Sequence, residues 1–272
     1  MEENRNMKIG IVGVGTIGSF LIRELRSDHS FELVAVADID ENHARRILAD
    51  NGYPESLLLP LEKFPEDTDV YIESAAASIA GDVAMYALNK GRTVIIASIG
   101  GLGDIDKYRS AAENHGGRLL LPSGAIAGLD ALKGIPPDSI SSVILKTTKP
   151  AKTLADMPYL KEKGINTLEF TEPARIFEGS ARDAAKAFPR SINVAAALSH
   201  AGIGLDRTRV EIWADPDGER NCHSIRVESG HGTLTTDVAN VPFEENPRTS
   251  RLAAYSILAT VRGLTKPVVV GT

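Results

Sequence analysis

The chain has 272 residues, of which 43% are hydrophobic and 24% charged. This composition is typical of soluble globular proteins and excludes collagen-like, disordered and disulfide-rich chains. The formal net charge of −6 gives no basic surface for nucleic acid or for an anionic membrane. We therefore expect small-molecule or protein partners.

The N-terminus and the cysteine content indicate the compartment. Residues 1–6 are polar, and no run of 18 or more apolar residues follows, so no signal peptide or membrane span is expected. The single cysteine, Cys222, can form neither an internal disulfide nor a cysteine-based metal cage. We expect a cytoplasmic protein without a bound metal.

Short apolar runs alternate with amphipathic stretches through the first half of the chain, as repeated strand–helix units require. A Rossmann-type doubly wound parallel sheet is therefore expected over residues 1–121. The predicted strands are 8–14, 32–37, 69–74, 93–97 and 118–121, and the predicted helices are 16–26, 41–49, 79–89 and 104–115.

The sequence pattern changes after Pro122, where prolines separate shorter and more amphipathic segments. Residues 122–245 are expected to form a second α/β domain with an open mixed or antiparallel sheet, and residues 246–272 to pack back on the first domain. The strands predicted for this second domain are 140–148, 208–214, 223–228 and 233–239, with a turn at 229–232, and its predicted helices are 181–188 and 192–200. A final helix, 250–262, is predicted in the segment that packs back on the first domain.

A glycine-rich segment, Gly13-Val14-Gly15-Thr16-Ile17-Gly18, follows the first strand and opens the first helix. In this context Gly13 permits a tight turn, Gly15 lets backbone N–H groups approach a pyrophosphate, and Gly18 allows close helix packing. The helix N-terminus then faces the anion. The segment predicts a dinucleotide site, although the same glycines would also suit a turn without a ligand.

Asp38 lies 20 residues after Gly18, where a carboxylate can accept hydrogen bonds from adenosine ribose hydroxyls. It would repel a 2′-phosphate, so NAD is preferred on charge. Arg45 and Arg46 on the next helix keep NADP open as a cofactor. The alternative for Asp38 is a solvated turn residue or a cap for the helix that begins near Glu41.

Three later loops at the carboxyl ends of strands consist of small residues, as a nicotinamide pocket would require. They are residues 74–78 with Ala76, 98–101 with Ser98, and 122–128 with Ala125. Tight turns also collect Gly, Ser and Ala, but three such loops at one rim favour a pocket.

Histidine is the natural proton acceptor for hydride transfer to NAD. Of the six histidines, His29, His43 and His115 are expected on the surface of the first domain and His231 in an exposed turn. His223 shares one strand face with apolar residues, and His200 shares one helix face with Asn193; this leaves both histidines as candidates. Asn193 could bind a carboxamide or a ribose, whereas Ser180 is expected to cap a helix.

Several segments together resemble the L-aspartate dehydrogenase family, over a stretch from about Met7 to the C-terminus. They are Gly13 to Gly18, PSGAIAGLDA at 122–131, FEGSA at 177–181, FPRSINVAA at 188–196 and ENPRTS at 245–250. The segment 157–166 departs from compact members by its length.

The resemblance implies NAD- or NADP-dependent oxidation of L-aspartate to iminoaspartate, which is released as oxaloacetate and ammonia or feeds quinolinate and NAD synthesis. It implies that His223 is the catalytic residue, that Ala125 and Asn193 bind the cofactor, and that the open sheet forms a homodimer contact. The substrate carboxylates need donors, and the residue types alone do not rank the candidates Lys149, Arg175, Arg182 and Arg190.

Two other functions remain open at this level. The chain could be another two-domain oxidoreductase, of the dihydrodipicolinate reductase or sugar dehydrogenase type, for which Lys149-Pro150 gives faint support. It could also be a non-catalytic module that senses NAD by domain closure.

Overall fold

The computed structural model describes residues 5–189 and 192–271, which fall into two compact units. The first unit runs to Pro122 and includes Ser256–Val269, so it is discontinuous in sequence. The second unit comprises Ser123–Tyr255 and the chain end from Val270.

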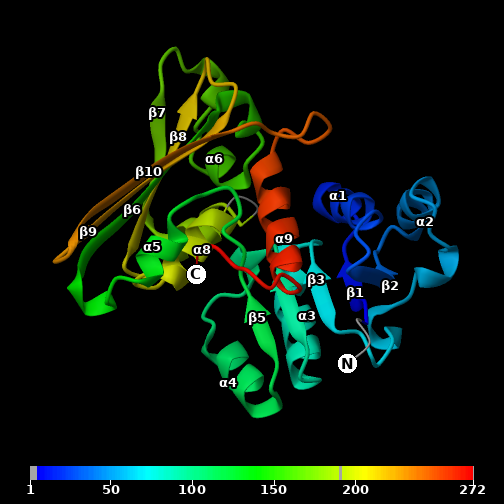
Figure 1. The fold of residues 1–272 in the computed structure, drawn as a ribbon. Coiled ribbons are helices and arrows are strands. Elements are labelled where there is room, and N and C mark those ends of the chain that lie inside the picture. Colours follow the sequence, from blue (N-terminus) through cyan, green and yellow to red (C-terminus); the bar gives the residue numbers. More distant parts are fainter. Residues whose placement is uncertain (1–4, 190–191, 272) are drawn as a thin grey trace. The chain divides into compact units, whose positions relative to one another are not determined.

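The first unit contains a five-stranded sheet in the order β2-β1-β3-β4-β5, with every neighbouring pair parallel. The predicted doubly wound fold is therefore confirmed (Figure 1). Its strands are β1 (Met7–Val12), β2 (Phe31–Ala37), β3 (Val70–Glu73), β4 (Thr93–Ile96) and β5 (Arg118–Leu120), and its helices are α1 (Thr16–Leu25), α2 (Glu41–Asp50), α3 (Ala77–Asn89) and α4 (Asp106–His115).

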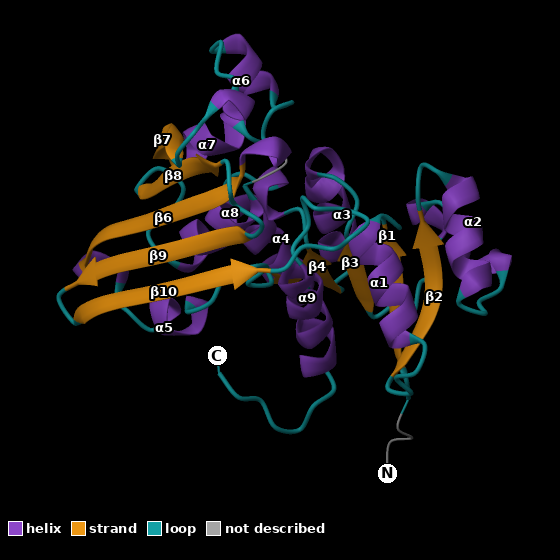
Figure 2. Ribbon diagram, turned by 90° about the horizontal axis from the view of Figure 1, so that it is seen from above, coloured by secondary structure: helices purple, strands orange, loops and turns teal. Residues whose placement is uncertain are grey.

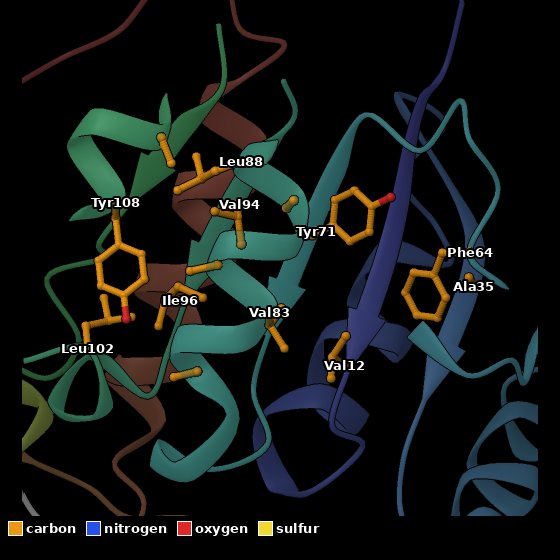
Figure 3. Packing of buried hydrophobic residues seen from close by; sticks show 14 residues of the cluster. Val12, Ala35, Phe64, Tyr71, Val83, Leu88, Val94, Ile96, Leu102 and Tyr108 are labelled. Carbon is orange, nitrogen blue, oxygen red and sulfur yellow. The ribbon is translucent and has the colours of Figure 1, made fainter. Parts of the chain in front are cut away.

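The sheet is buried on both faces, which explains its nearly continuous apolar strands. Figure 3 shows one side of this core, where Tyr71 of β3 and Val94 of β4 pack with Leu88 of α3 and Tyr108 of α4. Fully burying a large apolar side chain contributes roughly 1.5–3 kcal/mol. The core therefore fixes the strand ends from which the site loops emerge.

An ion pair joins the C-terminal segment of the first unit, Ser256–Val269, to the N-terminal part of the same unit. The Arg262 guanidinium lies 3.0 Å from the Asp28 carboxylate. Arg262 belongs to α9 (Arg251–Gly263), which is the predicted terminal helix.

The second unit contains a mixed sheet in the order β10-β9-β6-β8-β7. The pair β6–β8 is parallel and the other pairs are antiparallel. Figure 2 shows β6, β9 and β10 side by side. The strands are β6 (Ile140–Pro150), β7 (Ala174–Ser180), β8 (Thr208–Asp215), β9 (Asn221–Ser229) and β10 (Gly232–Asn240).

The helices of the second unit include two that the sequence pattern missed, α5 (Leu129–Lys133) and α6 (Pro158–Glu162). Five residues are too few to display a helical period. The other two helices are α7 (Ala181–Ala187) and α8 (Asn193–Ala201). The Ser180 hydroxyl accepts a hydrogen bond from the Asp183 N–H at 3.1 Å, which confirms the predicted cap of α7.

Strand β7 was also missed. A register shift between Arg175 and Phe177 breaks the two-residue alternation by which strands are recognised. The remaining elements are single-turn 3₁₀ helices at Glu55–Leu57, Leu61–Lys63, Ile99–Gly101, Pro137–Ser139, Ala151–Thr153 and Thr167–Glu169.

Candidate functional site

The glycine-rich turn of the first unit is sterically restricted at two glycines. Gly13 has φ of +95°, and a Cβ added there would lie 2.4 Å from the backbone of Ala75. A Cβ added at Gly18 would lie 2.0 Å from the Gly13 carbonyl oxygen. Because Gly13 turns the chain, β1 ends at Val12 rather than at the predicted Val14.

The N-terminus of α1 is open to an anion. Gly15 is the N-cap and supplies no capping side chain, and the first turn, which contains Thr16 and Ile17, has no acidic residue. Apart from the neighbouring residues of its own turn, no heavy atom of the described residues lies within 4 Å of a Cβ added at Gly15. An uncapped helix N-terminus with open space before it suits a pyrophosphate.

Asp38 lies at the end of β2 and turns back to the glycine-rich segment. Its carboxylate accepts hydrogen bonds from the Val14 N–H at 2.5 Å and the Asp40 N–H at 2.8 Å. Asp40, not Asp38, caps α2 by accepting from the His43 N–H. A carboxylate offers about four acceptor positions, so Asp38 keeps capacity for ribose hydroxyls.

A cavity of about 250 Å³ adjoins Asp38. Its charged lining consists of Asp38, Glu41, Glu55 and Arg45. Arg45 lies 2.7 Å from the Glu41 carboxylate and 2.6 Å from the Glu55 carboxylate. The cavity therefore has an acidic lining, and its arginine is already paired.

Glu73, which sequence reasoning missed, joins two of the predicted loops. Its carboxylate accepts from the Ala75 N–H at 2.8 Å and from the Ser98 N–H at 2.9 Å. The side chain is fully buried, and this burial raises its pKa against the opposing effect of the hydrogen bonds. Glu73 thereby holds the loops of Ala76 and Ser98. A charged residue at the end of the apolar run Val70–Glu73 was the available signal.

In the second unit, His223 of β9 faces inward and is 5% exposed. Its Nδ1 lies 3.0 Å from the hydroxyl of Thr147, its registered neighbour on β6. Burial, and then the charge of Lys149, lower the pKa of His223 to about 3. The imidazole is therefore uncharged at neutral pH.

Two buried asparagines connect His223 to the Ala125 loop. Asn221, two residues before His223, donates from Nδ2 to the Pro247 carbonyl at 3.3 Å. Asn240 of β10 donates to the Ala125 carbonyl at 3.0 Å and to the Asn221 carbonyl at 3.2 Å. The Oδ1 atoms of both asparagines are buried without a hydrogen-bond partner.

The Ala125 loop also lies beside α8. A Cβ added at Gly124 would be 3.8 Å from Val194 Cγ1, and Val194 follows Asn193, the first residue of α8. The structure thus brings Ala125, Asn193 and His223 into one region of the second unit. The sequence pattern did not identify Thr147, Asn221 or Asn240, because their grouping depends on strand pairing.

The other histidines differ in exposure and in contacts. His231 is exposed, as expected, and His200 lies at the C-terminal end of α8. The expectation of a solvated His43 was wrong, since its Nε2 lies 3.0 Å from the Val14 carbonyl oxygen. His43 therefore packs on the glycine-rich turn.

In residues 5–189 and 192–271, no three His, Cys, Asp or Glu side chains are grouped so that they could hold a metal ion. Over the same ranges, no helix has both the length and the apolarity to cross a membrane.

Comparison with known families gives matches over both units. The C-terminal model of aspartate dehydrogenase matches residues 130–264. The NAD-binding domain model of homoserine dehydrogenase matches residues 13–122.

Curated relatives match over nearly the whole chain. L-aspartate dehydrogenase from Methanosarcina acetivorans is 40% identical over 98% of this chain and 100% of its own. L-aspartate dehydrogenase from Methanocella arvoryzae is 40% identical over 97% of this chain and 99% of its own.

Solved structures extend the similarity to the fold. Aspartate dehydrogenase from Thermotoga maritima matches with a TM-score of 0.76 and 28% identity, over 98% of this chain and 100% of that one. A scyllo-inositol dehydrogenase from Lactobacillus casei with bound NAD(H) has a TM-score of 0.55 at 15% identity, over 96% and 89% of the two chains. The latter similarity shows a common fold alone.

Proposed function

This chain belongs to the L-aspartate dehydrogenase family, and we infer from that membership that it oxidises L-aspartate to iminoaspartate with a nicotinamide nucleotide. The observation that carries this conclusion is the 40% identity to L-aspartate dehydrogenases over nearly the full chain. The two other functions considered from the sequence, a different oxidoreductase and an NAD sensor, are not favoured by these relatives.

The first unit is the proposed nucleotide-binding domain. The uncapped N-terminus of α1 would bind the pyrophosphate through Gly15, Thr16, Ile17 and Gly18, and Asp38 would bind the ribose. The loops of Ala76 and Ser98, fixed by Glu73, would bind the nicotinamide end. When bound, this cofactor accepts the hydride from Cα of the substrate.

The second unit is the proposed substrate domain, with His223 as its base. The uncharged imidazole would take the ammonium proton or activate the water that attacks the iminium carbon. Thr147 fixes the ring through Nδ1 and leaves Nε2 for the substrate. Ala125 and Asn193 would contact the cofactor from this unit.

NAD is the proposed physiological cofactor in preference to NADP. The cavity beside Asp38 is lined by three carboxylates and one arginine, and that arginine is paired to two of them. A 2′-phosphate would meet repulsion without a free cation in this lining. Arg46, the other arginine considered from the sequence, is not among the lining residues.

The activity is tested by the near-ultraviolet absorbance of reduced nicotinamide. The protein is mixed with L-aspartate and either NAD or NADP at alkaline pH, with D-aspartate, L-glutamate and L-malate as matched controls. An increase with L-aspartate alone, faster with NAD, is expected. Cofactor binding without any increase would contradict the activity.

Assembly, compartment and metabolic role belong to the same proposal. The lone cysteine fits a reducing cytoplasm, and iminoaspartate suits the supply of quinolinate for pyridine nucleotide synthesis. A homodimer through the open sheet of the second unit is also proposed. Light scattering of the protein as it elutes from a size-exclusion column should give twice the chain mass. A monomer mass would contradict the proposed homodimer.

A further inference from the structure

Lys149, a cation without a counter-ion, lies near the C-terminal end of β6, on the inward face of the strand. Lys149 follows Thr147 by two residues, so both side chains are on the same face of the strand. Among the described residues, Lys149 makes no hydrogen bond or ion pair. Burial, and then the Arg248 guanidinium, lower the pKa of Lys149 to about 8. Part of the side chain remains accessible to a ligand.

The other cations considered for the substrate carboxylates are differently placed. Arg175 is paired with carboxylates of β7 and β8. Arg182 lies 2.5 Å from the Asp206 carboxylate. Arg190 lies outside the described residues. Of the described candidates, Lys149 alone has no carboxylate partner and is available to bind an external anion.

The groups that face Lys149 are cationic, titratable or apolar. Arg248 and His223 are within electrostatic range, and the elements packed against this end of β6 contribute apolar side chains of Leu154, Phe188 and Val194. Taking a charge out of water without a partner is unfavourable. A bound anion would remove that cost.

Acceptors for an ammonium group lie in the same region. The Nδ2 atoms of Asn221 and Asn240 donate to backbone carbonyls, which directs both unpartnered Oδ1 atoms away from those carbonyls. Asn221 shares its strand face with His223. A cation, two free acceptors and an uncharged imidazole are the complement of an amino-acid zwitterion.

We propose that Lys149, supported by Arg248, binds a carboxylate of the amino-acid substrate next to His223. This assignment rests on the proposed oxidation of L-aspartate and adds the residue that recognises its charge. A carboxylate on Lys149 would also offset the positive charge that disfavours protonation of His223. Substrate binding would thereby make the imidazole a stronger base.

The test compares Lys149→Met with Lys146→Met. Lys146 lies on the same strand but on the other face, with its Nζ 4.4 Å from the centroid of the Trp213 ring, so it is a matched control. We expect KM for L-aspartate to rise about tenfold to a hundredfold in Lys149→Met, as loss of a charge-assisted hydrogen bond predicts. Lys146→Met should keep the wild-type KM, and NADH binding by fluorescence should change less than about twofold in both variants.

Two further readouts separate binding from a structural role. Lys149→Met removes an uncompensated charge, so its thermal midpoint without ligand should equal or exceed that of the wild type. Lys149→Arg should recover most of the affinity. Succinate, a dicarboxylate without an ammonium group, should inhibit the wild type less above pH 8, where Lys149 loses its proton, and Lys149→Arg should not show this loss.

The outcomes distinguish the two levels of inference. Normal aspartate oxidation with an unchanged KM in Lys149→Met overturns the role of Lys149 alone. If Lys149→Met does not fold, equal pH dependence of succinate inhibition in the wild type and Lys149→Arg overturns it instead. A wild type that binds NADH but does not oxidise L-aspartate overturns the proposed function.

Discussion

The side chains of the two proposed sites differ in whether the chain itself supplies their partners. In the first unit, the carboxylates of Glu73 and Asp38 each accept two backbone N–H groups of the same chain. In the second unit, Lys149 has no anion and two asparagine oxygens have no donor. The first arrangement is preorganised without a ligand, whereas the proposed substrate would complete the second. Substitution of Glu73 should accordingly affect stability, and substitution of His223 or Lys149 should affect turnover or substrate affinity.

The largest expected effect is that of His223→Ala on turnover. Loss of a general base typically lowers kcat by about 10² to 10⁴-fold. NADH affinity should stay within about twofold, because His223 is not among the residues proposed to bind the nucleotide. A variant with near-wild-type kcat would remove His223 from the mechanism.

A smaller effect, on both stability and cofactor affinity, is expected for Glu73→Gln. An amide presents an N–H₂ group to one of the two backbone donors that the carboxylate now satisfies, which costs about 1–3 kcal/mol. Thermal unfolding and NADH titration should both show the loss, whereas the exposed Glu32→Gln serves as the control. Wild-type NADH affinity in Glu73→Gln would show that the loops do not depend on this carboxylate.

Release of Arg45 should change cofactor preference by a few-fold. The double variant Glu41→Gln, Glu55→Gln removes both carboxylate partners of Arg45 and lowers the negative charge beside Asp38. The ratio of kcat/KM for NADP to that for NAD should then increase. Adding Arg45→Gln to this double variant should abolish the increase, and an unchanged ratio in the double variant would place the 2′-phosphate elsewhere.

The smallest effect should come from the cap of α7. Ser180→Ala removes the acceptor for the Asp183 N–H, which typically costs about 1 kcal/mol. The thermal midpoint should fall by about 2–4 °C. Ser180→Thr, which keeps the hydroxyl, should restore most of it, and a clear loss of kcat in Ser180→Ala would indicate a role beyond capping.

Local patterns predicted the first unit better than the second. The glycines and Asp38 are separated by a fixed spacing within one strand–helix–strand unit, so a linear pattern can identify them. Glu73 joins two loops through backbone N–H groups, which carry no side-chain signal. Strand β7 was missed because a register shift breaks the alternation of inward and outward side chains along it.

The polar residues around His223 come together only because particular strands are neighbours in the sheet. Thr147 faces His223 because β6 pairs with β9, although 76 residues separate them. The inward orientation of His223 was predictable from alternation along its own strand, but its partner was not. Lys149 became distinct from the other basic residues only when their ion pairs were known.

The discontinuity of the first unit has a consequence for synthesis of the chain on the ribosome. Its sheet strands have all been made by Leu120, but the segment Ser256–Val269 that completes the unit follows the whole of Ser123–Tyr255. The ion pair between Asp28 and Arg262 therefore cannot form until the second unit has been translated. Most of the second unit, Ser123–Tyr255, can therefore fold as it emerges, before the first unit receives its last helical segment.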